Sequence, residues 1–274
     1  MLNFYFTNLT LLNFHVNCYT YPHMRDDRLK QHLKRLEEQR HQANERLEHQ
    51  RQRVNERFDR AQERLENSMS QHQERIIEAA LRLLDKEGLN SLSLRKLASQ
   101  LDMQAPGLYW HFKNKGTLID YLAEAILQEA FRDLQPREDS EPWQDWLTAT
   151  MNRLRKAMLN HTDGARVVAG AHIYPAVTLG KIFEVSAESL QTAGFDLLAT
   201  RSLMITAVTY TFGYVIEEQS SPSPDDLKGA ELADFLENFP ATAAAIKAAQ
   251  KAHKTEDDDF NAGLQLIIKG AANG

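Results

Sequence analysis

Residues 92–120 read LSLRKLASQLDMQAPGLYWHFKNKGTLID, and this stretch decides the fold. Its first half predicts a short helix with Ser93 as N-cap and with apolar residues at helical spacing, namely Leu94, Leu97, Ala98 and Leu101. Asp102 tolerates the left-handed backbone of a tight turn, and Pro106 fits the first turn of a second helix over about Gln104–Trp110. Two short helices around a tight turn predict a helix-turn-helix, whose second helix can enter the DNA major groove.

The residues after the second helix indicate phosphate binding. Asn114 is the expected N-cap of the next helix, which places Lys115 beside free backbone N–H groups. Arg95, on the first helix, is long enough to reach a guanine edge or a phosphate. A competing interpretation makes Tyr109 and Trp110 core aromatics and the lysines a solvated turn. The order of cap, break, aromatics and lysines favours DNA binding.

The pattern LxxRKLAxxL…PxLYWHxKNKxxLxD resembles that of the TetR family of bacterial transcriptional repressors. Asp102 stands where glycine is common, and Gly107 stands where a side chain such as Thr often contacts DNA. The resemblance implies a homodimer that binds a palindromic operator and is released by a small-molecule inducer. It also implies a set of DNA-contacting residues, which are Arg95, Gln104, Ala105, Pro106, Gly107, Tyr109, Trp110, His111 and Lys115.

Composition narrows the class of protein. Helix formers dominate the 274 residues and no long alternating run argues for a sheet, so we expect an all-α fold. The net charge of −6 means that DNA affinity depends on a local patch. A single cysteine, Cys18, excludes an intrachain disulfide and suits the cytoplasm. Without a nucleophile–base pair, Gly-rich phosphate loop or metal-ligand spacing, we expect no enzyme, no cofactor and no metal site.

The first residues are unlike the rest of the chain. Residues 1–23 carry no Lys, Arg, Asp or Glu and are rich in aromatics. They lack the basic start and unbroken apolar core of a signal peptide, and they are too polar and short to span a membrane. We interpret residues 1–24 as a disordered leader, with Met24 as an alternative start, and we expect no membrane partner.

A coiled-coil arm is expected over residues 25–70. Apolar residues alternate in steps of seven and four, at Leu36, Ala43, Leu47, Val54, Phe58, Leu65 and Met69. An eleven-residue repeat favours a nearly straight coil, and a narrow apolar stripe on a charged helix needs one partner helix. Alternatives are a lone charged helix, a disordered basic arm, or a hairpin, although no turn residue interrupts the stretch. We expect the arms of two subunits to pair antiparallel and to brace the DNA-reading heads.

Two further domains follow. We expect a helix-turn-helix domain with its linking helix over residues 71–135, beginning with a helix at Gln73–Glu87 that Gly88 stops. Pro136 and the acidic Glu138–Glu141 mark a boundary, and a ligand-binding and dimerisation domain occupies residues 136–274. Its helices are expected at Trp143–Asn160, Ala165–Ala171, Val177–Ala193, Leu197–Gln219, Leu232–His253 and Asp259–Ala272, with a loop at Ser220–Pro224.

Three passages of this domain resemble the tetracycline-repressor subgroup: TDGARVVAG at residues 162–170, AGF at 193–195 and TFGYVIEEQ at 211–219. The resemblance implies that Leu197–Gln219 and Asp259–Ala272 build a four-helix dimer interface. It also assigns pocket positions where the subgroup's drug and magnesium contacts, most of them polar, are replaced, at Phe131, Thr150, Leu154, Val168 and Ser186.

Among these polar contacts only the acid at Glu217 is retained, which removes the means to hold a magnesium chelate. We therefore expect a mainly apolar ligand, contacted also by Val208, with His172, Ser186 and Thr209 as polar anchors. Plain core packing is the competing interpretation of Phe131, Leu154 and Val168. A constitutive or architectural DNA-binding protein with a vestigial pocket remains the alternative function.

Overall fold

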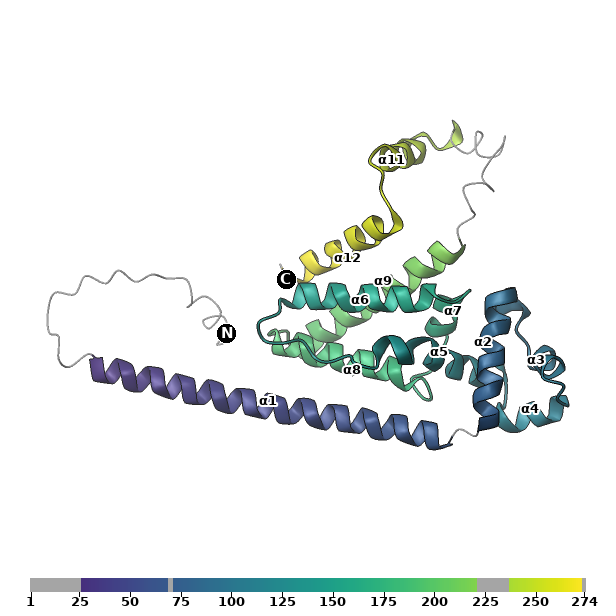
Figure 1. Ribbon diagram of the computed structural model, residues 1–274. Helices are drawn as coiled ribbons and strands as arrows, with labels where there is room; N and C mark the ends of the chain where they lie inside the picture. Colours follow the sequence, from purple (N-terminus) through teal and green to yellow (C-terminus); the bar gives the residue numbers. More distant parts are fainter. Residues whose placement is uncertain (1–25, 69–70, 221–236, 273–274) are drawn as a thin grey trace. The chain divides into compact units, whose positions relative to one another are not determined.

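The computed structural model describes residues 26–68, 71–220 and 237–272, and within these ranges every regular element is an α-helix (Figure 1). This confirms the expected all-α fold. The chain divides into two compact units, Met1–Glu63 and Arg64–Gly274. Among the described helices, none combines the length and the apolar character that crossing a membrane requires. The predicted leader, residues 1–24, lies outside the described residues.

The first unit is represented by one helix, α1 (Asp26–Ser68), which continues into the start of the second unit. It contains no Gly or Pro and runs for 43 residues without a break, about 65 Å at 1.5 Å per residue. The prediction of one long helix is confirmed, and the hairpin alternative is wrong. Pairing of this arm with another helix stays a prediction.

The head of the second unit contains α2 (Gln71–Ser91), α3 (Leu94–Gln100) and α4 (Ala105–His111). The apolar face of α2 is buried, including Ile76, Ala80 and Leu84. Gly88 breaks the helix as predicted, because its φ of 75° and ψ of 170° lie in a region that is essentially restricted to glycine. The three helices and α5 (Lys115–Phe131) share one apolar core.

Helix α5 belongs to both predicted domains. It packs on α2 of the head and also on α6 (Trp143–Leu159), α7 (Gly164–Ala169) and α8 (Val177–Thr192). The segment after it, where Pro136 suggested a boundary, is a packed loop around buried Arg137. The Arg137 backbone N–H donates to Ser189 Oγ at 3.0 Å, and its guanidinium donates to the carbonyls of Glu138 and Glu141. Head and helical domain therefore join through a continuous core.

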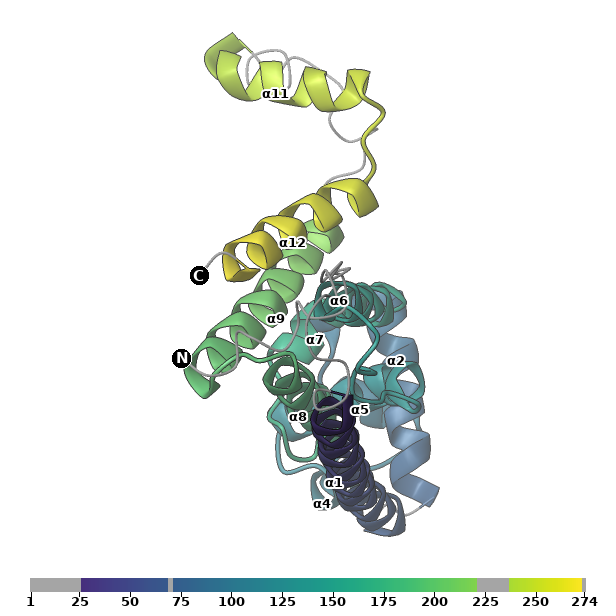
Figure 2. The ribbon, with the colours of Figure 1, turned by 90° about the vertical axis from the view of Figure 1, so that its left-hand side faces the viewer.

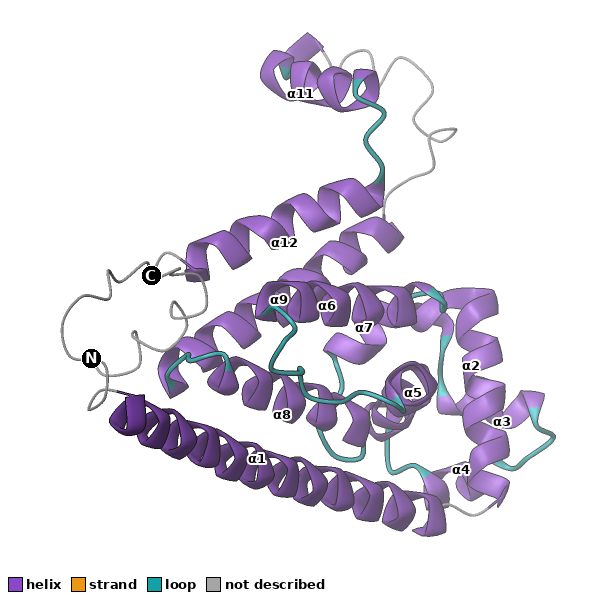
Figure 3. Ribbon diagram, turned by 60° about the vertical axis from the view of Figure 1, so that its left-hand side comes forward, coloured by secondary structure: helices purple, strands orange, loops and turns teal. Residues whose placement is uncertain are grey.

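The helical domain is completed by α9 (Leu197–Ser220), α11 (Pro240–Lys251) and α12 (Glu256–Ala272). Helix α9 contacts α6, α7 and α8, and α12 runs beside α9 (Figure 2). Seen from another side, α5 lies among α6, α7 and α8 (Figure 3). The start of α9 is fixed by Asp196, whose carboxylate accepts the N–H groups of Leu198 and Ala199 at 2.9 and 2.8 Å.

Two helix starts differ from the sequence-based expectation by three residues or more. Helix α12 begins at Glu256, three residues before the expected Asp259, because Thr255 and Asp258 cap it reciprocally. The described helix in the segment expected at Leu232–His253 is α11, which starts at Pro240. Residues 221–236, including most of the expected Ser220–Pro224 loop, lie outside the described residues.

Candidate DNA interface and ligand core

The N-cap of α3 fixes which side of this helix faces the core. Ser93 Oγ accepts the backbone N–H of Lys96 at 3.2 Å, as the sequence predicted. Leu94 and Leu97 consequently point into the core, being 6% and 0% exposed. Arg95 is exposed on the opposite side. A long cation held on a capped helix, with its neighbours anchored in the core, is free to meet a base edge or a phosphate.

The turn between α3 and α4 is tight. Asp102 has a φ of 51°, the left-handed conformation expected for it. The N–H of Met103 donates back to Ala98 O at 2.9 Å, which closes the turn. Helix α4 then starts after Gln104, with Pro106 in its first turn. The two short helices thus have the connection that a helix-turn-helix requires.

Helix α4 has one buried and one open face. Leu108 is fully buried, whereas Tyr109 is 47% and Trp110 is 89% exposed. Gln104 and Pro106 are also exposed, while Ala105, Gly107 and His111 are half-buried. The interpretation of Tyr109 and Trp110 as core aromatics is therefore wrong. An indole left in water at this position suits a surface that a partner covers.

A basic edge follows α4. Lys113 is exposed, and Asn114 caps α5 by accepting the N–H of Thr117 at 2.9 Å, as predicted. Lys115 is half-buried, and its Nζ donates to the carbonyl oxygen of Leu89 at 2.8 Å. Its ammonium thus braces the end of α2, a partner that the sequence did not indicate. The phosphate contact expected from Lys115 stays a prediction.

Polar contacts join the head to the α6–α7 turn. The carboxylate of Asp85 on α2 accepts the N–H of Thr162 at 3.1 Å and lies 3.2 Å from His161 Nδ1. Asp163 Oδ2 accepts the N–H of Leu89 at 2.8 Å, directly beside Gly88. A shift of this turn would therefore move the end of α2 with it. The α6–α7 turn therefore contacts the head and also belongs to the helical domain.

The same turn is held from α9. Gln219 Nε2 donates to the carbonyls of Met158 and His161 at 3.2 and 2.7 Å, while its Oε1 accepts the N–H of Ala165 at 3.1 Å. One amide side chain thus satisfies three backbone groups at the start of α7. Sequence reasoning gave Gln219 no role, because its partners are distant from it in the chain.

Six of the nine predicted ligand positions lie in the interior of the helical domain. They come from α5, α6, α7, α8 and α9, and each is at most 4% exposed: Phe131, Thr150, Leu154, Val168, Ser186 and Val208. The four apolar members belong to one continuous core. Phe131 also carries the guanidinium of Arg153 over its ring, 5.1 Å from the ring centroid. Within the described residues, the hydroxyl of Ser186 has no hydrogen-bond partner.

The other three predicted positions do not join this group. Thr209 and Glu217 lie on exposed sides of α9. His172 is exposed too, with its N–H donating to Asp120 Oδ1 at 2.9 Å and its Nδ1 at 3.2 Å from the same atom. Thr209, expected as a polar anchor of the pocket, is exposed, whereas its neighbour Val208 is buried.

Two buried acids on α5 were missed. Asp120 and Glu124 are 7% and 4% exposed and stand one helical turn apart. Glu124 accepts the backbone N–H and the hydroxyl of Thr178 at 2.7 and 2.8 Å, and Asp120 holds His172. Together they fasten the segment between α7 and α8. The sequence signal that could have revealed them is a pair of acidic residues on the apolar face of a predicted helix.

A second cluster holds α12 on α6 and α9. Arg155, whose side chain is 3% exposed, donates to both oxygens of Glu218 at 2.8 and 2.6 Å and also pairs with Asp257. Burial disfavours the charged guanidinium, yet these hydrogen bonds outweigh it and raise the pKa of Arg155 above its usual value. The guanidinium in turn lowers the pKa of the Asp257 carboxyl. The cluster stabilises the position of α12.

Val168 is the predicted ligand position that bears on metal binding. Val168 is fully buried, and its side chain has no atom that could ligate a metal ion. No group of three or more His, Cys, Asp or Glu side chains suited to a metal ion occurs among the described residues.

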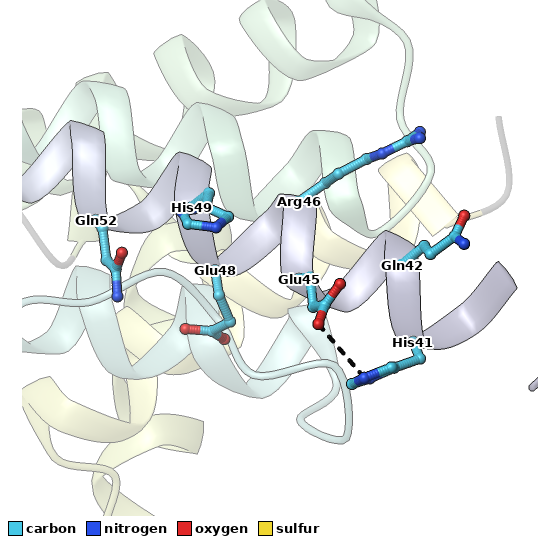
Figure 4. A pocket seen from close by; sticks show the side chains of 7 residues that line it. All are labelled: His41, Gln42, Glu45, Arg46, Glu48, His49 and Gln52. Carbon is cyan, nitrogen blue, oxygen red and sulfur yellow. Dashed lines mark ion pairs between the residues drawn. The ribbon is translucent and has the colours of Figure 1, made fainter. Parts of the chain in front are cut away.

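A surface hollow on α1 is a different feature. Seven side chains line it, and Figure 4 shows that all come from one helix: His41, Gln42, Glu45, Arg46, Glu48, His49 and Gln52. All seven are exposed, and His41 Nε2 lies 3.4 Å from Glu45 Oε1. Ligand pockets are mostly apolar and enclosed, so polar side chains on one exposed helix face make no such site.

Comparison with known families accounts for nearly all of the second unit. Residues 76–122 match the family described as bacterial regulatory proteins, tetR family. Residues 135–273 match the tetracyclin repressor-like C-terminal domain. The chain is 36% identical over 197 residues to the tetracycline repressor protein class A from transposon 1721 of Escherichia coli, covering 72% of this chain and 88% of the relative.

Solved structures agree with this assignment. A variant of TetR from Acinetobacter baumannii AYE in complex with minocycline is 30% identical with a TM-score of 0.56, covering 75% of this chain and 98% of that one. BioQ bound to its natural double-stranded DNA operator is 26% identical with a TM-score of 0.55, covering 75% and 100%. With its helix-turn-helix head and helical C-terminal domain, the chain belongs to the TetR family of bacterial transcriptional regulators.

Proposed function

We propose that this protein is a homodimeric, non-enzymatic repressor in the cytoplasm that binds a palindromic operator through the exposed face of α4. The observation that carries the proposal is the contrast between buried Leu108 and Trp110, which is 89% exposed on the same short helix. The BioQ–operator complex, all of whose protein chain is matched by this one, supports DNA as the partner of this face. Arg95 and Gln104, both exposed, are the proposed readers of base edges.

The functional division that we propose is an arm over residues 25–70, a DNA-binding head with its linking helix over 71–135, and a ligand-binding and dimerisation domain over 136–274. The contacts of α5 with both head and helical domain support coupling between the last two. A ligand that displaces α7 would also displace the α6–α7 turn, which is hydrogen-bonded to the end of α2. Release of DNA then follows from a change in the position of the head.

The ligand that we propose is small and mainly apolar, and it is not a tetracycline–magnesium chelate. Phe131, Leu154 and Val168 offer only apolar surface at the positions in question. Ser186 is the proposed polar anchor, because a buried hydroxyl without a partner costs about 1–3 kcal/mol, which a ligand hydrogen bond would offset. The minocycline complex of a TetR variant supports a small molecule as the ligand.

A second candidate is a constitutive DNA-binding protein whose pocket has closed. Its supporting observation is that the same side chains are fully buried in one continuous core, with Arg153 over Phe131. The two candidates differ in a single measurable property. A ligand-released repressor loses operator affinity when the right small molecule is present, and a constitutive protein does not.

The test titrates the full chain onto DNA from its own upstream region and onto a scrambled duplex of equal length, at one salt concentration. We expect tighter binding to the upstream DNA, by roughly a thousandfold or more as is usual for specific sites. Equal binding to both duplexes would contradict the repressor proposal. A panel of apolar small molecules, preselected by thermal shift, is then added to the specific complex, and no effect from any of them favours the constitutive candidate.

Isothermal titration tests the ligand class separately. Tetracycline with magnesium is expected to give no binding at micromolar concentration, since no imidazole stands at Val168. Magnesium-dependent binding in that range would show that the chelate is held by other residues and would overturn this part of the proposal.

A further inference from the structure

Helix α1 lies outside the region that the family matches, which begins at residue 76. Leu47 stands at the midpoint of this helix, equally far from Asp26 and from Ser68. The apolar residues are arranged symmetrically about this midpoint. Leu36 and Phe58 are equally distant from it on opposite sides, and so are two more pairs further out, namely Leu33 with Ala61 and Leu29 with Leu65.

These positions form one stripe, because the steps between them are mostly three or four residues. The stripe is continuous in three dimensions only if the helix does not break, and α1 runs unbroken from Asp26 to Ser68. The opposite side of the helix is polar. Every α1 side chain that the structure describes as exposed is polar or charged, for example Lys34, Glu45 and Arg60.

We propose that α1 pairs antiparallel with α1 of a second copy of this chain, with Leu47 at the centre. In this register the two helices overlap over their full length, and Leu47 faces the partner subunit's Leu47. Leu36 then lies opposite Phe58, and Leu29 lies opposite Leu65, so that most layers between Leu29 and Leu65, about 54 Å apart, are apolar on both sides.

Two arginines in the stripe decide the direction. Arg40 and Arg51 lie seven and four residues from Leu47, on opposite sides. A parallel pair in register would place each arginine against its own copy, which brings like charges together in the seam. The antiparallel pair places Arg40 opposite Val54 and Arg51 opposite Ala43, where the aliphatic stems can lie on small apolar neighbours. Arg51 Nη1 also donates to Glu48 Oε1 of the same helix at 3.1 Å, so this charge has a partner within its own chain.

Flanking charges are compatible with this register but do not select it. The facing pairs Arg28–Glu66, Arg35–Asp59, Glu37–Arg57 and Arg46–Glu48 have opposite signs, whereas Lys30–Arg64, Lys34–Arg60 and Glu38–Glu56 have like signs. Exposed pairs contribute little in either direction. The apolar layers and the placement of the two arginines therefore carry the inference. Paired arms would give the dimer a second interface, separate from the one expected of α9 and α12.

Single cysteines in the full chain test the register, with Cys18→Ser as the background. Leu47→Cys is expected to give a disulfide-linked dimer in most of the protein under mild oxidation, because the two sulfurs meet at the centre. Leu29→Cys is expected to give at least tenfold less, since the two copies lie toward opposite ends of the coil, about 54 Å apart. A mixture of Leu29→Cys chains with Leu65→Cys chains is expected to link as readily as Leu47→Cys.

The matched control is Glu45→Cys, an exposed position close to the centre, which is expected to link at least tenfold less than Leu47→Cys. Circular dichroism checks that each variant keeps its helix. If Leu47→Cys disturbs the helix, mixed Leu36→Cys and Phe58→Cys chains test the same register.

Three outcomes would overturn the proposal. Linking of Leu29→Cys to itself as readily as Leu47→Cys would mean a parallel pair. If Ala43→Cys or Val54→Cys links to itself more readily than Leu47→Cys, Leu47 is not at the centre of the antiparallel pair. Absence of linking at every stripe position, in a protein that sediments as a dimer, would mean that the stripe is covered within its own subunit.

Discussion

The DNA-reading head and the interior of the helical domain present their candidate binding residues in opposite ways. The head keeps the residues of its outer face on an exposed surface, with Arg95, Gln104 and Trp110 open to solvent. The interior has apolar side chains at Phe131, Leu154 and Val168, all fully buried. A surface that binds DNA must keep its chemistry outside, whereas a pocket can change ligand by exchanging buried side chains.

This contrast has a consequence for mutations. Changes in the interior of the helical domain should lower stability, because they disturb packing or a buried charge. Changes at exposed side chains of the head should leave stability nearly intact and alter DNA binding, whereas half-buried Lys115 should affect both. Four sets of substitutions test this separation, in decreasing order of the expected effect.

Arg155→Met should have the largest effect. It removes the partner of Glu218, whose side chain is only 15% exposed, and leaving a buried charge unpaired costs about 3–5 kcal/mol. The measurement is urea unfolding followed by circular dichroism. Asp257→Asn is the matched control and should cost far less, because that side chain is 68% exposed. Equal costs for the two variants would show that the Arg155–Glu218 pair is not the main contact.

The pH dependence of stability gives a second test of the cluster around Arg155. The pKa of Asp257 is lowered in the folded protein by Arg155, so its contribution to stability is present above the usual carboxyl value of 3.8 and is lost as the pH falls through the lower folded value. Wild type should therefore lose more stability than Asp257→Asn when the pH is lowered below 3.8. An equal loss of stability in wild type and in Asp257→Asn would show that Asp257 is not the cause of the acid sensitivity.

Gly164→Ala should be the next most costly change. A Cβ at this position would overlap the carbonyl oxygen of Met158, a backbone atom that cannot move away alone. Overpacking of this kind costs about 1–3 kcal/mol. Because the affected turn contacts Asp85 and Gly88 of α2, operator affinity should fall together with stability. A stable Gly164→Ala protein would mean that the turn adapts freely.

Lys115→Ala and Lys113→Ala form a pair on the head. Replacing Lys115 should cost about 1 kcal/mol of stability, because its bond to Leu89 O is lost. Lys113 is exposed, and its replacement should change stability by less than about 0.5 kcal/mol. If Lys115 also contacts phosphate, its variant should lower the salt dependence of DNA binding by about one charge. If Lys115→Ala is as stable as wild type, the bond from Lys115 to Leu89 O does not stabilise the fold.

Gly107→Ala should have the smallest effect, and a favourable one. The added Cβ would lie 3.7 Å from Met103 Cε, an ordinary contact, in the middle of α4. Alanine is preferred to glycine there by about 0.8–1 kcal/mol. The melting temperature should rise slightly, by contrast with Gly164→Ala. A fall would indicate that α4 needs glycine for a reason other than space.

Local features of this structure could be predicted from the sequence. The caps Ser93 and Asn114, the left-handed Asp102 and the break at Gly88 depend on a few neighbouring residues, and all are observed. The order of the described helices follows in the same way from the spacing of apolar residues. The residues expected to contact DNA came from the family resemblance, and their contacts with DNA stay a prediction; the structure shows that Gln104, Pro106, Tyr109 and Trp110 are exposed on α4.

Long-range pairs could not be predicted. Lys115 with Leu89, Asp120 with His172 and Gln219 with the α6–α7 turn join residues that are 26 to 61 positions apart. No local pattern encodes such partners, since any exposed polar residue could supply them. Likewise, Pro136 suggested a domain boundary because no nearby residue indicates the packing around Arg137. That packing involves Ser189 on a helix that is distant in the sequence.

The most direct test of the account compares Arg95→Ala with wild type on the upstream operator and on the scrambled duplex at one salt concentration. Arg95 is exposed on α3, the first helix of the helix-turn-helix, so its loss should not affect folding. We predict that operator binding weakens by about 1–3 kcal/mol while binding to scrambled DNA changes much less. Equal weakening on both duplexes, or none on either, would contradict sequence-specific reading by this face.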